Sequence, residues 1–195
     1  MCEIKKTQIE KGDKFTVDKP QWGYDKYIPK VYAQIVYDDS AFYVKYTAYE
    51  KNPRREKQNN FEYVNEDSCV EFFANFMPDT SEYYFNFEFN ANAIVNFSFR
   101  KNRYEFIKLT EEDAEALEAK AQIYDDKWVV DYKIPFTLLS KYYGSFDISK
   151  CTKIKGNLFK CGDKTEIEHY LAHFNINSDI PDYHLPQYFG EISVK

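Results

Sequence analysis

The sequence predicts an all-β fold, an antiparallel β-sandwich with one short surface helix. Aromatic residues make up 19% of the 195 residues, including 18 Tyr and 17 Phe, and such residues favour strands over helices. Short segments that alternate between apolar and polar residues recur along the chain, with turn residues between them. This length fits a single domain over residues 1–195, because β-sandwiches of this size are often one unit.

The alternating segments indicate eight to ten strands, most of them joined as hairpins. Residues 31–37 and 42–49 give the clearest hairpin, because Asp38, Asp39 and Ser40 between them are typical turn residues. Residues 1–20 are expected to form a tail or a first edge strand. Further strands are expected at residues 69–76, 83–90, 94–100, 128–134, 153–160 and 190–194.

Residues 110–120 predict the helix, with about three turns. Thr110 is a suitable N-cap, acidic residues fill the first turn, and Ala and Leu dominate the rest. The apolar stripe is weak, which indicates a helix on the surface. A short helical turn is expected at 135–139, where Pro135 can occupy the first position. Residues 50–66 and 165–187 are expected to be long loops, which often carry function.

Charge and hydropathy limit the partners of the chain. The net charge is −6 and the pI is about 5.2, and an acidic chain without a basic cluster is a poor partner for nucleic acid. We find no signal peptide and no apolar run of 18 residues, so we expect no membrane span. We therefore expect a soluble monomer that is cytoplasmic as written, or extracellular if the chain is a trimmed precursor.

Cysteines and tryptophans are few. The four cysteines are widely and irregularly spaced without a CxxC pair, which argues against a structural zinc site and favours free thiols. Trp128 begins a predicted strand and is expected in the core. Trp22 lies between Pro20 and Gly23, and it is a candidate for an exposed ring, although a core position is equally plausible.

The stretch with the clearest alternation also carries the candidate binding residues. In its two strands Phe and Val occupy one face, while Glu71, Asn86 and Glu88 occupy the other, beside aromatic rings. Carboxylates and amides accept hydrogen bonds from sugar hydroxyls, and rings supply contact area. Asn157 and Lys160 on a nearby strand are expected to join this row. A solvated sheet face is the plainer interpretation, and a glycosidase pair of Glu71 and Glu88 is another.

Three histidines give a different hypothesis, a metal-dependent hydrolase. His169, His173 and His184 would bind the metal together with Cys161 or Asp163. The first two histidines are four residues apart, but their segment alternates like a strand and lacks the Glu of the HExxH motif. The plainer interpretation is that they hold their loop through hydrogen bonds. No GxSxG motif or Gly-rich phosphate loop occurs.

Five motifs follow one another along the chain, namely DSCVEFF (67–73), YFNFEFNA (84–91), NLFKCGD (157–163), HYLAHFNI (169–176) and PDYHLPQYFG (181–190). Together they resemble the family-9-like carbohydrate-binding modules, especially the solitary bacterial type. The similarity extends from about residue 15 to residue 195. It implies an immunoglobulin-like, jelly-roll-like β-sandwich that binds a sugar end between two aromatic rings without cleaving it. It also implies that polar side chains and structural calcium support the site.

Three positions depart from the family pattern. Relatives often have Trp at the positions of Asn65 and His173, and Arg at the position of Leu185. One aromatic wall would therefore be Tyr63 or His173, or would be absent, and the resemblance assigns the other to Tyr183. The expected ligand-binding set is Tyr63, Glu71, Asn86, Glu88, Asn157, Lys160, His173, Tyr183 and His184.

We therefore expect a non-catalytic protein that holds a mono- or oligosaccharide end and needs no cofactor for that binding. Any role in polysaccharide hydrolysis would be accessory. A small hydrolase is the first alternative. The second is a sandwich that has kept the fold but binds a protein or a haem-like ligand, since one fold hosts many functions.

Overall fold

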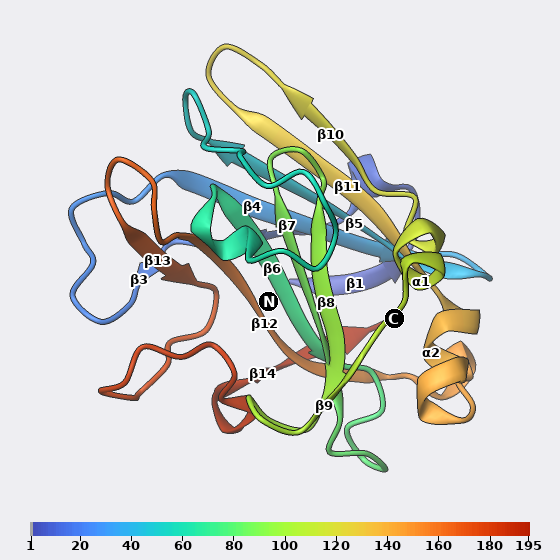
Figure 1. Cartoon of the computed structure of the whole chain (residues 1–195). Helices are drawn as coiled ribbons and strands as arrows, with labels where there is room; N and C mark the ends of the chain where they lie inside the picture. Colours follow the sequence, from blue (N-terminus) through green and yellow to red (C-terminus); the bar gives the residue numbers. More distant parts are fainter. Residues whose placement is uncertain (1) are drawn as a thin grey trace.

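The computed structural model describes residues 2–195, and the chain is mostly β with two α-helices (Figure 1). The described strands are β1 Glu3–Lys6, β2 Lys14–Thr16, β3 Lys19–Pro20, β4 Lys30–Tyr37, β5 Ala41–Tyr49, β6 Cys69–Asn75, β7 Tyr84–Asn90, β8 Val95–Arg100, β9 Phe106–Lys108, β10 Lys120–Ile123, β11 Trp128–Pro135, β12 Lys153–Gly162, β13 His169–Ala172 and β14 Gly190–Val194. The helices are α1 Glu111–Ala116 and α2 Phe136–Tyr143. The chain therefore has more strands than expected, because short ones such as β2 and β3 lack a readable alternation.

The strands form one continuous, curled sheet with two halves. The β4–β5 half has the order β10-β11-β5-β4, and the β6–β7 half has the order β14-β12-β6-β7-β8-β9. Strand β1 joins them, because it pairs in parallel with β14 on one side and with β4 on the other. The sheet is therefore mixed, and the expected antiparallel arrangement does not hold where β1 pairs with β14 and β4. Residues 3–6 are an internal strand instead of a tail or an edge.

The core lies between the two halves and contains the apolar face of each alternating strand. Val70 and Phe72 of β6 and Phe87 and Phe89 of β7 are fully buried there. The Phe89 ring meets the ring of Tyr132 from β11 at a centroid distance of 4.3 Å. Burial of aromatic rings at this density supplies most of the hydrophobic stabilisation. Trp128 is also fully buried, as predicted.

The helices differ from the prediction of one three-turn helix. Thr110 forms the expected capping box with Asp113, but α1 ends at Ala116. The next residue, Leu117, is fully buried, and its carbonyl accepts a bond from the Lys133 amide of β11. Tertiary packing therefore ends the helix before its sequence pattern does. The turn expected after Pro135 is a full second helix, α2.

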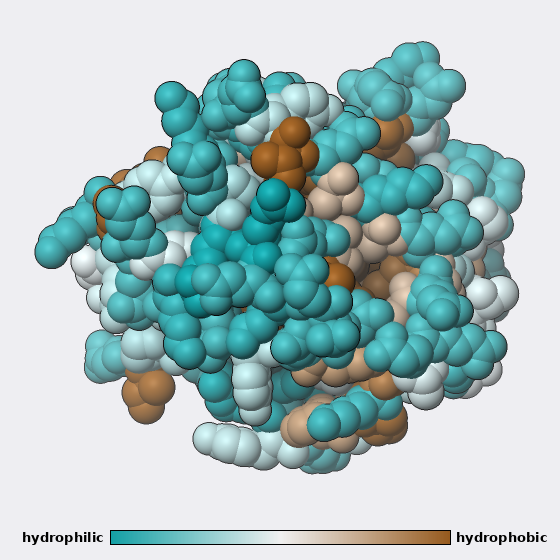
Figure 2. Space-filling view, turned by 45° about the horizontal axis from the view of Figure 1, so that its top comes forward, coloured by the Kyte–Doolittle hydropathy of each residue, from teal (hydrophilic) through white to brown (hydrophobic). Residues whose placement is uncertain are grey.

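The face shown in Figure 2 is mostly hydrophilic, with a few small apolar areas. Such scattered apolar residues are normal for a folded protein. Neither helix in residues 2–195 has the length and apolar character that crossing a bilayer requires. The four cysteines, all within the described residues, are free, as predicted.

Candidate functional site

The polar row predicted from the sequence lies on the face of the β6–β7 half that points away from the core. Strand register places Glu71 of β6 directly opposite Glu88 of β7, and Glu88 opposite Asn96 of β8. On the other side of β6, Glu71 faces Phe159 of β12. Because side chains at paired positions project to the same side of a sheet, four strands build one floor.

Loops cover this floor, so it is not a solvated sheet face. Every residue of β6 and β7 is buried, including those that point away from the core. Under the loops a cavity of about 380 Å³ remains, near the lower end of the range for small-molecule sites, which is about 300–1,000 Å³. Its lining residues are Trp22, Tyr63, Asn65, Glu71, Phe73, Glu88, Asn96, Arg100, Arg103, Phe106, Cys161, Asp163, Tyr170, Pro181, Asp182, Tyr183 and His184.

Glu88 is held in the floor by amides. It is 5% exposed, and its two carboxylate oxygens accept bonds of 2.6 Å from Asn86 and 2.9 Å from Asn96. Burial raises the pKa of this carboxyl, while the two amide donors act against the rise. Asn86 is itself completely buried beneath the cavity. It therefore fixes the orientation of Glu88 from below instead of meeting a ligand.

Arg100 supplies a cation beside this carboxylate. Its Nε donates to Asn86 Oδ1 at 3.0 Å and to Ser98 Oγ at 2.8 Å, and its guanidinium lies over the Phe106 ring at 4.7 Å. Burial lowers its pKa from the usual value, but an arginine stays charged at neutral pH. No described residue accepts a bond from its Nη2, which leaves that donor available on the cavity side.

His184 closes one side of the cavity as a neutral ring. It stacks on Phe73 at a centroid distance of 4.7 Å, and its Nδ1 lies 3.1 Å from the Tyr84 hydroxyl and 3.5 Å from Arg100. Burial and the charge of Arg100 hold its pKa well below the usual value. Since Arg100 can only donate, Nδ1 is the acceptor and the proton is on Nε2.

Aromatic rings form the walls. Tyr183 stacks flat on Phe159 with centroids 4.0 Å apart, and its hydroxyl donates to backbone carbonyls of β12 and β13. The Trp22 ring meets Tyr183 at 5.3 Å, and its Nε1 donates to the Ser178 carbonyl. Tyr63 is 72% exposed at the rim. Trp22 therefore has the partly exposed position expected for a ligand contact. Tyr183 is instead held in place by its stacking on Phe159 and its hydrogen bonds.

Two predicted residues lie elsewhere, and their spacing explains why. Asn157 and Lys160 are three positions apart on β12, so they face opposite sides of the sheet. Lys160 is 0% exposed, and its Nζ contacts His169 and Glu50 between the two halves. Asn157 faces the cavity side but is covered, and its side chain bonds the backbone of Phe174. Neither residue lines the cavity, so their place in the ligand-binding set was wrong.

The three histidines do not meet. His169 contacts Lys160 and the Ile167 carbonyl, while the Nδ1 of His173 lies near the Thr16 carbonyl, away from the cavity. Of the three, only His184 lines the cavity. Within residues 2–195, no cluster of three potential ligand side chains includes a histidine. The proposed histidine metal site is therefore not formed, and His173 is not the missing aromatic wall.

Calcium has no carboxylate cluster in the part of the chain that the structure describes. The cluster of three potential metal ligands there is Cys69, Glu71 and Cys161, and thiols are poor ligands for a cation that prefers oxygen. Structural calcium therefore stays a prediction.

Sequence reasoning missed several lining residues. Asn96 and Arg100 share one parity on β8, next to the row of Asn86 and Glu88, so the alternation of β8 could have found them. Asp182 and Arg103 form an ion pair of 2.7 Å between two loops, and no local pattern signals such a pair.

A larger depression of about 900 Å³ lies on the outer face of the β4–β5 half. Tyr43, Lys45, Gln122, Tyr124 and Lys133 are among its lining residues, and all of these are partly or fully exposed. The smaller cavity instead brings buried charged groups together under aromatic walls. We therefore place the functional site in the smaller cavity.

Comparison with known proteins agrees with the geometry. The sequence profile of carbohydrate-binding family 9 matches residues 4–194, which is nearly the whole chain. The chain belongs to carbohydrate-binding family 9. A comparison with curated proteins found no match.

Solved structures share the fold of this family 9 chain at low sequence identity. A carbohydrate-binding protein from Bacteroides uniformis, described as putative, is 23% identical with a TM-score of 0.79, over 94% of this chain and 86% of that one. A family 9 module from Caldicellulosiruptor kristjanssonii in complex with cellotriose is 13% identical with a TM-score of 0.67, over 100% and 93%. One from the same organism in complex with glucose is 15% identical with a TM-score of 0.60, over 92% and 83%.

Proposed function

We propose that the chain binds the end of a mono- or oligosaccharide in the cavity between Trp22, Tyr63 and Tyr183, without cleaving it. The observation that carries this proposal is the combination of aromatic walls with a floor of ordered hydrogen-bonding groups. Glu88 offers acceptors, and Arg100 offers a donor with no protein partner among residues 2–195. A sugar ring matches both, because it has apolar faces and a rim of hydroxyls.

The size and shape of the cavity support an end-binding mode. The volume of about 380 Å³ suits one or two sugar rings better than a long chain lying across a face. Family membership adds independent support, as do the two module structures in complex with cellotriose and glucose. We therefore propose β-linked glucose oligosaccharides as the first ligands to test.

A glycosidase is the second candidate, because Glu71 and Glu88 are direct cross-strand neighbours and burial raises the pKa of both carboxyls. However, both acids rise side by side from one floor, whereas a hydrolytic pair flanks the glycosidic bond. Side-chain amides also donate hydrogen bonds to both oxygens of Glu88, and the Cys161 thiol donates one to an oxygen of Glu71. We therefore propose that the chain is not an enzyme. Turnover of nitrophenyl glycosides that Glu88→Gln abolishes would overturn this conclusion.

Calorimetric titration tests sugar binding. We expect heat and a 1:1 stoichiometry with at least one of glucose, cellobiose, cellotriose and xylobiose at millimolar concentration. Trp22→Ala should weaken that binding, since it removes one wall of the cavity. Tyr124→Ala is the matched control, because it removes an exposed ring from the other half of the sheet. No heat with any of these sugars, or equal loss in both variants, would contradict the proposal.

Further properties extend the proposal. The two halves enclose a shared core, which supports the description of an immunoglobulin-like sandwich. The net charge of −6 supports a protein that does not bind nucleic acid. We still expect a monomer without a membrane partner. We also expect a cytoplasmic location, or an extracellular one for a trimmed precursor. An accessory role in polysaccharide degradation is part of the same proposal.

A further inference from the structure

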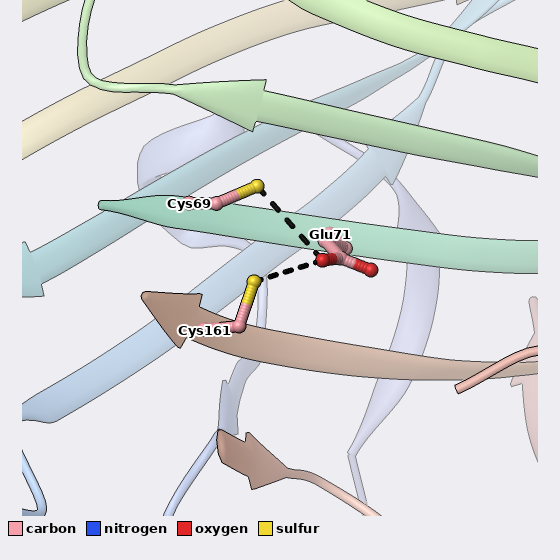
Figure 3. A group of neighbouring side chains, drawn as sticks. All are labelled: Cys69, Glu71 and Cys161. Carbon is pink, nitrogen blue, oxygen red and sulfur yellow. Dashed lines mark hydrogen bonds between the residues drawn. The ribbon is translucent and has the colours of Figure 1, made fainter. Parts of the chain in front are cut away.

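Two thiols and a carboxyl group meet at the floor of the cavity (Figure 3). Cys69 of β6 and Cys161 of β12 are direct partners in the strand register. The Cys161 thiol donates to Glu71 Oε1 at 3.0 Å, and the Cys69 Sγ lies 3.9 Å from the same oxygen. The three potential ligand atoms all lie within 4.8 Å of one another. Cys residues 92 positions apart in the sequence thus form one compact cluster.

No basic side chain within residues 2–195 bonds to this cluster. Lys160 is next to Cys161 on β12 but points to the opposite face of the sheet, where it contacts Glu50. The three side chains are buried, and the only polar side chains that they contact within residues 2–195 are one another. A thiophilic cation can take the place of the protons on such ligands.

We propose that Cys69, Cys161 and Glu71 bind one thiophilic divalent cation of the zinc class. In a tetrahedral zinc site with Zn–S bonds of about 2.3 Å, the two sulfur atoms lie about 3.8 Å apart and each lies about 3.5 Å from a ligating oxygen. The observed separations of 3.0 and 3.9 Å bracket that sulfur–oxygen value. Small side-chain rotations therefore convert the cluster into a metal site.

The fourth coordination position would face the cavity. Glu71 and Cys161 both line it, and the second carboxylate oxygen of Glu71 points away from the two sulfurs (Figure 3). Away from the cavity, Val64 supplies an apolar surround, which strengthens metal–thiolate bonding because it excludes water. Three protein ligands and one open position are typical of zinc sites that accept an exchangeable ligand.

Two plainer interpretations compete with this proposal. A buried cysteine is usually an inert apolar side chain, but inert packing does not explain a carboxyl oxygen shared between two thiols. A disulfide is the other competitor, since direct cross-strand partners can be bridged. Oxidation to a disulfide would consume both sulfur ligands. The disulfide and the metal-bound form therefore exclude each other, and one experiment separates them.

Cobalt titration of the reduced full chain tests the proposal. We expect one Co²⁺ per chain, with thiolate-to-cobalt charge-transfer absorption and tetrahedral visible bands, and we expect Zn²⁺ to displace the cobalt. Loss of an outer partner of a metal ligand weakens binding about 10–100-fold. We therefore expect Cys69→Ser and Cys161→Ser, which remove a direct ligand, to weaken binding by more than about 100-fold.

Cys2→Ser is the matched control, because Cys2 lies just before β1, where its thiol contacts the Lys14 carbonyl outside the cluster. It should keep the full charge-transfer signal. Circular dichroism shows whether each variant folds. The cobalt spectrum of the reduced wild-type chain tests the proposal even where a variant does not fold. Absence of charge transfer in reduced wild type would overturn the proposal, and so would its survival in Cys69→Ser/Cys161→Ser. A Cys69–Cys161 disulfide that resists reduction would also overturn it. None of these results depends on sugar binding.

Discussion

Two buried polar clusters lie on opposite faces of the same strands, and they differ in how completely their groups are paired. We call the first the interior cluster, which lies between the two halves of the sheet. We call the second the cavity floor. The interior cluster consists of Glu50, Ser68, Trp128, Lys160 and His169, and the cavity floor consists of Glu71, Asn86, Glu88 and Arg100.

The interior cluster is closed. One oxygen of Glu50 accepts from Ser68 at 2.9 Å, and the other accepts from Trp128 at 2.9 Å and lies 3.3 Å from the Lys160 Nζ. Lys160 also donates to the Cys161 carbonyl and contacts His169. A buried charge is tolerated only when it is paired and hydrogen-bonded in this way. The cluster therefore holds the two halves together, and its hydrogen-bonding groups are already used within the protein.

The cavity floor is open. Arg100 has a guanidinium nitrogen without a partner among residues 2–195, and the second oxygen of Glu71 also lacks one. These groups are only slightly exposed, yet they line a cavity. The comparison teaches that burial alone does not mark a binding site. Unused donors and acceptors beside an open volume do.

Removal of Lys160 should have the largest effect. We expect Lys160→Met to lower the free energy of unfolding by about 3–5 kcal/mol, because it leaves the Glu50 charge buried without its cation. Denaturant unfolding measures this value. Lys155→Met is the matched control, because Lys155 is an exposed residue of the same strand, and it should change stability little. Equal effects of both variants would break the distinction between a closed cluster and an ordinary surface.

Acid should destabilise the chain through His169. Burial, together with the charge of Lys160, lowers its pKa from 6.5 to about 4. The unfolded chain therefore binds the proton first, and the stabilisation present above pH 6.5 is lost as the pH falls toward 4. The loss should approach about 3 kcal/mol at most.

Denaturant unfolding of wild type and His169→Gln across this pH range isolates that contribution. The raised pKa values of Glu71 and Glu88 act in the opposite direction in both proteins, so they cancel in the difference. We expect a shallower pH dependence in the variant. Identical slopes would show that His169 does not stay neutral in the folded chain.

Replacement of Glu88 should reduce affinity more than stability. We expect Glu88→Gln to weaken sugar binding about 10- to 100-fold, which corresponds to the loss of a hydrogen bond to a charged acceptor. Calorimetry with the best sugar from the panel measures the change. Glu191→Gln is the control on the exposed part of β14. Unchanged affinity in Glu88→Gln would mean that the floor does not meet the ligand.

Removal of the exposed ring at the rim should have the smallest effect. Tyr63→Ala should weaken binding about 2- to 10-fold, the range expected for a single aromatic contact. Tyr104→Ala is the comparison, because its ring is even more exposed but lies outside the cavity lining. A larger loss in Tyr104→Ala would place the ligand over the β8–β9 turn instead.

The alternation of polar and apolar residues was sufficient to predict the long strands and the row of Glu71 and Glu88. It failed where structure depends on distant partners. Lys160 was placed on the wrong face although its spacing from Asn157 already excluded that face. Trp22 at the wall could not be assigned, because its position depends on contacts with Ser178 and Tyr183, more than 150 residues away in the sequence.

The parallel pairing of β1 has a consequence for assembly. Only four residues, Glu3–Lys6, close the gap between β4 and β14, with two register pairs on each side. A chain that lacks this segment would leave short open edges at residues 193–194 and 36–37, because β2 still pairs with the rest of that β4 edge. We expect a separate peptide of the same sequence to pair with these edges by strand addition.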